Sequence, residues 1–207
     1  MDTECKWLPV KVLTETETPM STPSWPANLL APPSTNMPRE VNILIPIFPG
    51  FNLFDVSAMD ILGSGGNQVT FKYTITSHTE DTKAAQGAIV KCYKSFVQVI
   101  YCIGDFHVLI QPGGRLEKIS AYREDIDTFR QHLGIIDHLR TLCPIQSEPY
   151  ILLSVGPGAL LIAPTGAFSG LRVTTRHDMP ELLRQDCEEY RRMHRGHPVT
   201  IIPQPDL

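Results

Sequence analysis

The chain has 207 residues, of which 42% are hydrophobic and 19% charged, and its formal net charge is −4. This composition is typical of folded globular proteins and excludes wholesale disorder and fibrous or collagen-like structure. The 18 basic residues form no dense block against the 22 acidic ones, so we expect neither nucleic acid nor a membrane as a partner. The length fits one α/β domain with an extension.

The compartment is predicted from the cysteines and the N-terminus. Five cysteines are widely spread and include no C-x-x-C pair, which indicates a reducing compartment rather than a disulfide scaffold or a zinc ribbon. The N-terminus shows no apolar signal segment, so we expect a cytoplasmic protein. Residues 149–171 carry no charge, but their prolines and glycines would break a membrane helix. We interpret them as a buried strand followed by a buried helix.

Residues 1–40 differ in composition from the rest of the chain. They hold seven of the 18 prolines, mixed with serine and threonine. Such a segment buries too little apolar surface to offset its ordering entropy, so we predict a disordered Pro/Ser/Thr-rich extension. An apolar run begins at residue 41, and residues 41–207 are predicted to form one folded domain.

Strands and helices alternate along this predicted domain. Six segments have the apolar or alternating pattern of strands: residues 41–48, 69–76, 87–92, 105–111, 150–155 and 199–203. Four have the length or periodicity of helices: residues 53–63, 126–139, 157–168 and a segment that starts near Pro180. The buried face of the second helix is predicted to consist of Ile126, Phe129, Leu133, Ile136 and Leu139. The order predicts an α/β fold with three layers and a doubly wound, mostly parallel sheet, of the flavodoxin-like type.

A doubly wound sheet binds its ligands beyond the carboxyl ends of its strands. Three segments follow the main apolar strands: PGFNLFD at residues 49–55, PGG at residues 112–114 and GPGA at residues 156–159. These segments are therefore the candidate site.

The same segments resemble the DJ-1/PfpI family, which has the class I glutamine amidotransferase-like fold, and within it the isocyanide hydratase-like branch. The resemblance covers about residues 41–183 and rests on FPGFNLFDV, DFHVLIQPGG and LLSVGPGALLIAPTGAFSGLRVTT. Relatives continue through a further strand and helix that help to build the pocket and the dimer surfaces. The resemblance therefore implies a C-terminally shortened domain, with a homodimer as one expected association.

The family's reactive cysteine has no counterpart in this sequence. It follows the third strand within the pattern Ser-Val-Cys-Thr-Gly-Ala, and Gly156 takes its place here. Thiolate chemistry needs a sulfur at this turn. The next residue, Pro157, has no N–H to offer an oxyanion. Glycine accepts the strained backbone of a nucleophile elbow, so we expect an elbow kept as a structural turn, with room for a larger ligand.

The resemblance assigns Asp55 to the aspartate that handles protons opposite the cysteine in isocyanide hydratase-like relatives. In a partly closed apolar cleft this carboxyl is expected to act as a general acid or base. The alternative is that Asp55 only caps the helix that follows. Gly113 and Gly114 match the family's Pro-Gly-Gly turn, for which the alternative is a tight turn that needs glycine. Substrate contacts are predicted at Gly113, Gly114, Gly156, Pro157 and Gly158, and no metal or cofactor is expected.

Two functions are consistent with these residues. The first is an enzyme of lyase, hydratase or isomerase type that acts on a hydrophobic small molecule through Asp55, by hydration, dehydration, isomerisation or cyclisation, in specialised metabolism. The second is a non-catalytic small-molecule-binding or accessory protein, that is, a pseudoenzyme. A third hypothesis places redox chemistry at Cys92, Cys102 or Cys143.

Overall fold

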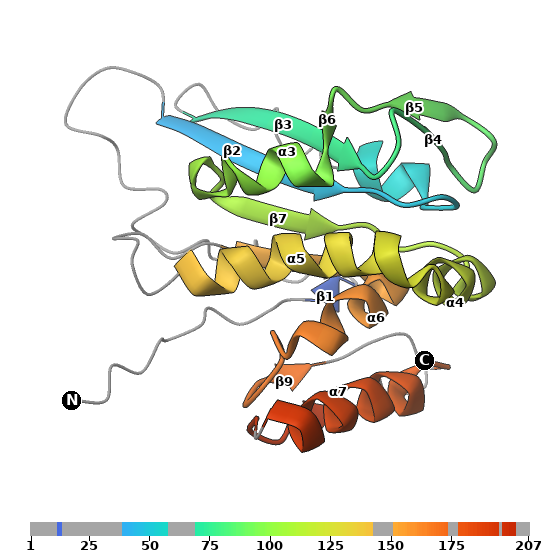
Figure 1. The fold of residues 1–207 in the computed structure, drawn as a ribbon, viewed down its shortest axis with the longest axis vertical. Helices are drawn as coiled ribbons and strands as arrows, with labels where there is room; N and C mark the ends of the chain where they lie inside the picture. Colours follow the sequence, from blue (N-terminus) through green and yellow to red (C-terminus); the bar gives the residue numbers. More distant parts are fainter. Residues whose placement is uncertain are drawn as a thin grey trace, which may run out of the picture.

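A six-stranded sheet forms the centre of the computed structural model, which describes residues 12–13, 39–57, 69–142, 151–173, 178–194 and 196–201. All neighbouring strands of this sheet are parallel, in the order β1-β8-β7-β2-β3-β6. They are β1 (Val12–Leu13), β2 (Arg39–Pro46), β3 (Val69–Ser77), β6 (Lys94–Ser95), β7 (Val108–Gln111) and β8 (Ile151–Val155). Helices flank the sheet (Figure 1), which confirms the predicted α/β fold.

The order of the long strands fixes where a ligand site is expected. The chain runs from β2 outward to β3, and then returns past β2 to β7 and β8. The strand order therefore reverses between β2 and β7, which pair through Ile43 with Val108 and Leu44 with Leu109. In flavodoxin-like sheets this reversal opens a crevice at the carboxyl ends of the two strands.

Five helices are described besides a helical turn at residues 53–57. They are α3 (Phe96–Ile100), α4 (Leu116–Glu124), α5 (Ile126–Leu142), α6 (Ala159–Ile162) and α7 (Pro180–His194). Short 3₁₀ turns are η1 (Ile103–Asp105), η2 (Gly156–Gly158) and η3 (Ala163–Thr165). Two smaller sheets are the antiparallel hairpin of β4 (Asp81–Lys83) and β5 (Ile89–Lys91), and the parallel pair β9 (Arg172–Val173) and β10 (Thr200–Ile201). The hairpin projects beyond the sheet in Figure 1.

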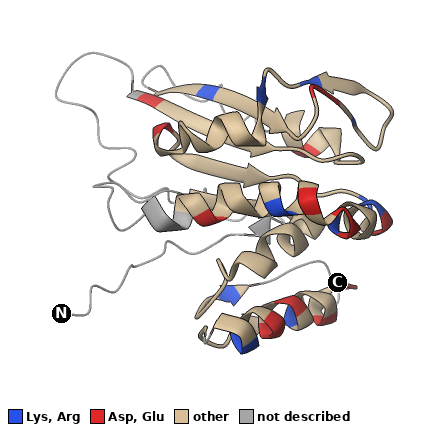
Figure 2. Ribbon diagram, viewed as in Figure 1, with Lys and Arg blue, Asp and Glu red and all other residues tan. Residues whose placement is uncertain are grey.

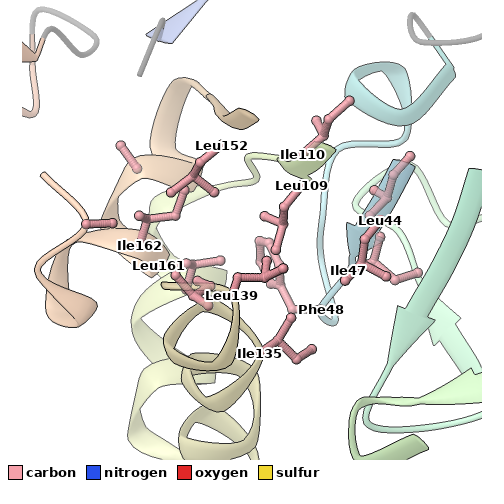
Figure 3. Close-up of a cluster of buried hydrophobic side chains, with 14 of the residues drawn as sticks. Leu44, Ile47, Phe48, Leu109, Ile110, Ile135, Leu139, Leu152, Leu161 and Ile162 are labelled. Atoms are coloured by element: carbon pink, nitrogen blue, oxygen red, sulfur yellow. The ribbon is translucent and has the colours of Figure 1, made fainter. Parts of the chain in front are cut away.

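The core lies between the sheet and the helices α5 and α6. Figure 3 shows side chains from β2, β7, β8, α5 and α6 that meet in one cluster. Its fully buried members include Leu44, Phe48, Leu109, Ile135 and Leu161. Because β2 and β7 lie inside the sheet, their apolar runs are covered by neighbouring elements, as the sequence predicted.

The predicted buried face of α5 is partly wrong. Ile126, at the start of the helix, is 65% exposed, whereas His132 and Ile135 are buried. Ile136 and Leu139 are buried as predicted, whereas Thr128, His132 and Ile135 take the other inward positions, displaced around the helix axis from the predicted ones. The displacement was not predicted because two of the inward positions hold polar residues.

Residues 149–171 contain the predicted strand, β8, followed by the helical turns of residues 156–165. Among the described residues, no helix is both long enough and apolar enough to cross a membrane. Within the predicted extension, Val12 and Leu13 form β1, which the sequence did not predict. Residues 1–11 and 14–38 lie outside the described residues, so their disorder stays a prediction.

Acidic and basic residues are interspersed along the ribbon in Figure 2. Helix α7, for example, carries acidic and basic residues along its length. One ion pair ties this helix to the main body, because Arg123 of α4 donates two hydrogen bonds of 2.8 and 2.7 Å to the carboxylate of Asp186. Such a bidentate pair has a fixed geometry and orients α7 against α4.

Candidate functional site

Three segments meet at Gly113, beyond the carboxyl ends of β2, β7 and β8. A Cβ atom on Gly113 would lie 2.6 Å from the carbonyl oxygen of Val155, 3.1 Å from Cδ of Pro157 and 3.2 Å from Oδ2 of Asp55. The structure thus brings together three of the predicted site residues, which are far apart in sequence. They lie where the strand order reverses, the usual place of a ligand site in this type of sheet.

Asp55 is held on both of its carboxylate oxygens. Its Oδ2 accepts a hydrogen bond of 2.8 Å from the backbone N–H of Gly113, and its Oδ1 accepts one of 2.6 Å from the side-chain amide of Asn52. The residue is only 9% exposed. A carboxyl group can accept a hydrogen bond on each of its oxygens, so these two donors fix the orientation of the group.

The helix cap in this segment is Asn52, and the alternative that Asp55 provides it is wrong. Residues 53–57 are helical, so Asp55 lies inside the first turn. Asn52 precedes that turn, and its Oδ1 accepts a hydrogen bond of 3.3 Å from the N–H of Phe54, as an N-cap does. The N–H of Asn52 also donates to the carbonyl oxygen of Gly113 at 2.8 Å. Asn52 and Asp55 together therefore bind both backbone polar groups of Gly113.

The turn after β8 has the backbone expected of an elbow. Gly156 has a φ of +46°, which residues other than glycine rarely adopt, and Pro157 follows in the first turn of η2. A Cβ atom on Gly156 would meet no described heavy atom within 4 Å. The position therefore restricts the backbone but leaves space for a side chain or for a ligand.

The other glycines of the candidate site are required for a different reason. None of Gly113, Gly114 and Gly158 has a positive φ. Instead, a Cβ atom on Gly114 would lie 2.7 Å from the carbonyl oxygen of Gly50, and one on Gly158 would lie 2.7 Å from that of Gln111. Close approach of main chain to main chain excludes a side chain here, rather than the tight turn considered from the sequence. Their contact with a substrate stays a prediction.

A buried polar network supports the Pro-Gly-Gly turn from below. The amide of Gln111 donates to the carbonyl oxygen of Pro112 at 3.1 Å, and its Oε1 lies 2.7 Å from Nε2 of His132. Nδ1 of His132 lies 3.0 Å from the hydroxyl of Tyr122. Because Gln111 uses its NH₂ group on carbonyl oxygens, its Oε1 accepts from His132 Nε2–H, and Nδ1 accepts from Tyr122.

Burial determines how the groups of this network titrate. His132 is fully buried, and the loss of solvation lowers its pKa from 6.5 to about 3. Burial also raises the pKa of Tyr122 well above its usual value, with a smaller contribution from the charge of Asp125. Both groups are therefore neutral at physiological pH, and they act as hydrogen-bonding groups rather than as charges.

The cysteines lie elsewhere, as far as the structure describes them. Cys92 and Cys187 are buried, and burial raises the pKa of both thiols, that of Cys187 to about 12. Cys102 is half-buried, and its sulfur lies 3.7 Å from the ammonium nitrogen of Lys94. Cys143 lies outside the described residues. Redox chemistry at Cys92 is disfavoured by its raised pKa, because the thiolate is the reactive form.

Two residues near Asp55 were not predicted from the sequence. Asn52 carries a signal that was available, because asparagine directly before a helix is a preferred N-cap residue. Gln86, in the hairpin turn, binds Asn52 and had no sequence signal. Within the described part of the chain, no group of three or more His, Cys, Asp and Glu side chains is placed to hold a metal ion.

Several solved structures with a similar fold are those of DJ-1/ThiJ/PfpI proteins. A ThiJ/PfpI family protein from Pseudomonas syringae matches with a TM-score of 0.55 and 19% identity, over 82% of this chain and 62% of its own. Drosophila melanogaster DJ-1beta matches with a TM-score of 0.55 and 18% identity, over 80% of this chain and 75% of its own. A ThiJ/PfpI domain protein from Brachyspira murdochii matches with a TM-score of 0.53 and 15% identity, over 73% of this chain and 78% of its own. This chain has a DJ-1/ThiJ/PfpI-like fold.

The likeness is one of structure. No family model matches the sequence, and no curated protein matches it either. The chain spans less than two thirds of the length of the Pseudomonas syringae protein, although it spans about three quarters of Drosophila DJ-1beta. The comparisons therefore show the fold alone, and the chemistry must be argued from the residues of this chain.

Proposed function

We propose that this chain binds a hydrophobic small molecule over Gly156 and that Asp55 transfers a proton to or from it, without a covalent intermediate. The observation that carries the proposal is that Asp55 and Pro157 both lie beside Gly113, next to the turn at Gly156, where no described atom would contact an added Cβ. The sequence resemblance implies that Gly156 corresponds to the family's reactive cysteine. A proton-transferring carboxyl is then the reactive group that this site retains.

The chemistry available to a lone carboxyl limits the reaction. General acid or base catalysis contributes about 10²- to 10⁴-fold in rate, which suits an activated substrate but not an amide. In a hydration, Asp55 takes a proton from water while the water oxygen bonds to the substrate carbon, and returns that proton to the neighbouring atom. Dehydration is the reverse, and isomerisation or cyclisation moves one proton in the same way. A lyase, hydratase or isomerase in specialised metabolism fits these limits.

A second candidate function is the binding of a small molecule without its conversion. It is favoured by the two hydrogen bonds of Asp55, to Gly113 and Asn52, which give the carboxylate a structural role that needs no substrate. In this function the protein is a pseudoenzyme or an accessory protein. The cytoplasmic location, the absence of nucleic-acid and membrane partners, and a homodimer remain predictions for either function.

The test compares metabolite profiles of isogenic strains that carry the wild-type gene, a deletion, Asp55→Asn or Asp127→Asn. Asp127 is a matched control because it is exposed, on α5, and the same substitution there leaves the site intact. We expect one precursor to accumulate in the deletion and in the Asp55→Asn strain, with turnover of the purified variant reduced at least about 10²-fold. The Asp127→Asn strain should match the wild type.

The two functions give different results in this comparison. If the purified wild-type protein binds the accumulated compound but does not convert it, the enzymatic function is contradicted and the binding function is supported. If the compound is converted equally by the Asp55→Asn protein, Asp55 has no part in the reaction. Far-UV circular dichroism and thermal unfolding of each variant verify that the fold is intact, because the loss of a hydrogen bond to a carboxylate costs about 1.5 to 3 kcal/mol.

A further inference from the structure

The hairpin of β4 and β5 contacts the segment that carries Asp55. The N–H of Gly50 donates to the carbonyl oxygen of Lys83 at 2.8 Å, and the N–H of Ala85 donates to that of Phe51 at 2.9 Å. The contact therefore involves the main chain on both sides. It brings the hairpin turn, residues 84–88, to the beginning of the helical turn at residues 53–57.

Gln86 makes the side-chain part of this contact. Its Oε1 accepts a hydrogen bond of 3.1 Å from the N–H of Leu53, and its Nε2 donates one of 2.7 Å to Oδ1 of Asn52. The turn presents this side chain through Gly87, whose φ of +90° allows the tight reversal. Because the N–H of Leu53 can only donate, it determines which end of the Gln86 amide faces Asn52.

The hydrogen bonds from the hairpin to Asp55 all run in one direction. Asn52 Oδ1 accepts from Gln86, so its Nδ2 is the end that donates to Asp55 Oδ1. The other oxygen of Asp55 accepts from Gly113. Each donor thus points towards the carboxylate, and hydrogen bonds in such a chain polarise and strengthen one another.

We propose that Gln86 is a positioning residue for Asp55, which acts through Asn52, and that docking of the β4–β5 hairpin therefore sets the orientation of the proposed proton-transferring carboxylate. The proposal deepens the proposed function, on which its kinetic part rests. Its geometric part concerns only the hydrogen bond from the N–H of Gly113 to the carboxylate of Asp55. The side chain of Gln86 hydrogen-bonds to Leu53 and Asn52 and reaches Asp55 only through Asn52, so we class it as a positioning residue and not as a catalytic one.

Two substitutions separate the donor role of Gln86 from hairpin docking. Gln86→Ala removes both side-chain hydrogen bonds. Gln86→Glu keeps an acceptor for the N–H of Leu53 but cannot donate to Asn52, and its charge favours a reversed Asn52 amide that presents oxygen to Asp55. Lys83→Ala is the matched control, because Lys83 lies in the same hairpin and contributes its backbone oxygen to the contact.

The readout is amide hydrogen exchange of Gly113 by NMR, together with the side-chain amide resonances of Asn52. We expect exchange at Gly113 to become about five-fold faster in Gln86→Ala and in Gln86→Glu, as loss of one hydrogen bond implies, and to stay unchanged in Lys83→Ala. The Asn52 resonances should move in both Gln86 variants. Unchanged exchange at Gly113 in a folded Gln86→Ala protein would overturn the proposal.

A double-mutant cycle tests whether Gln86 acts through Asn52. Gln86→Ala should have no further effect on Gly113 exchange in an Asn52→Ala background, and a full effect there would contradict the proposal. The kinetic part predicts a fall in kcat with little change in KM for both Gln86 variants. Faster exchange at Gly113 without a fall in kcat supports the positioning role of Gln86 and contradicts the proposed chemistry of Asp55. The exchange measurement therefore tests the positioning role, and kcat tests the proposed function, independently of one another.

Discussion

The two sides of the candidate site are built in different ways. On the Asp55 side, side chains hold the main chain: Asn52 and Asp55 bind the polar groups of Gly113, and Gln111 binds Pro112 from below. On the side of residues 156–158, main chain lies directly on main chain. There a Cβ atom on Gly158 would lie 2.7 Å from one carbonyl oxygen and 2.8 Å from a second.

This difference indicates which side can carry chemistry. The turn at residues 156–158 has no side chain that titrates, and no described atom lies within 4 Å of a Cβ placed on Gly156. The Asp55 side offers a carboxylate in one fixed orientation. Substitutions on the two sides should therefore destabilise the protein for different reasons. At residues 156–158 the cause is collision or backbone strain, and on the Asp55 side it is the loss of hydrogen bonds.

Gly158→Ala should have the largest effect on stability. The new methyl group would collide with the carbonyl oxygens of Gln111 and Pro112, which are backbone atoms and cannot move aside as a side chain would. We expect a loss of about 3 kcal/mol in the free energy of unfolding. Urea unfolding measures it, and a loss below about 1 kcal/mol would mean that the two turns do not pack on one another.

The polar network below Pro112 predicts a pH dependence of stability. The folded protein keeps His132 neutral down to a pKa of about 3, whereas the unfolded chain takes up a proton near pH 6.5. Stability from this group is therefore present above about pH 6.5 and is lost as the pH falls towards 3, by about 2 to 3 kcal/mol at about pH 4.5. Urea unfolding above about pH 6.5 and at about pH 4.5 measures this loss of stability.

His132→Gln is the comparison that isolates this contribution. It should remove the pH-dependent part of the loss, because it cannot titrate, while an amide can still donate to Gln111. Other acidic and basic groups titrate alike in both proteins, so the difference between the two pH profiles belongs to His132. Parallel profiles of the wild-type protein and the variant would show that folding does not lower the pKa of His132.

Gly156→Ala is expected to have the smallest effect of these substitutions. No described atom lies within 4 Å of the new methyl group, so the cost comes only from a side chain at a φ of +46°. That cost is about 1 to 2 kcal/mol.

Gly134→Ala is the matched control, in α5 with an ordinary contact of 3.7 Å to Ile100, and it should stabilise by about 0.5 to 1 kcal/mol. Thermal unfolding of the two variants measures both effects. Destabilisation by Gly134→Ala as large as that by Gly156→Ala would argue against backbone strain as the cause.

The long buried elements could be predicted from the sequence, whereas of the short strands only some could: β5 and β10 lie within the predicted strands at residues 87–92 and 199–203, and β1 and β4 were missed. Strands β2, β3, β7 and β8 have continuous or alternating apolar patterns that can be recognised without knowing which strands lie beside them. The strands β1 and β4 span two and three residues, too few to show a pattern, and exist because a partner strand supplies their hydrogen bonds. Helix α4 was missed because only Ile119 and Tyr122 of its nine residues are buried.

Within the candidate site, the sequence indicated positions but not contacts. The left-handed backbone of Gly156 was expected from the replacement of an elbow residue, and the structure has it. The role of Asn52 as the cap could have been predicted from its place before the helix. The contribution of Gln86 could not, because it depends on a hairpin whose docking is set by tertiary contacts.

The most direct test of a thiol-independent site is the turnover of the accumulated precursor by wild-type protein whose cysteines have been alkylated with iodoacetamide under native conditions. Mass spectrometry establishes which thiols have reacted, and unmodified Asp55→Asn protein is measured beside it. We expect the alkylated protein to keep its activity and the Asp55→Asn protein to lose at least about 10²-fold. Loss of activity on alkylation, with activity retained in Asp55→Asn, would contradict the account.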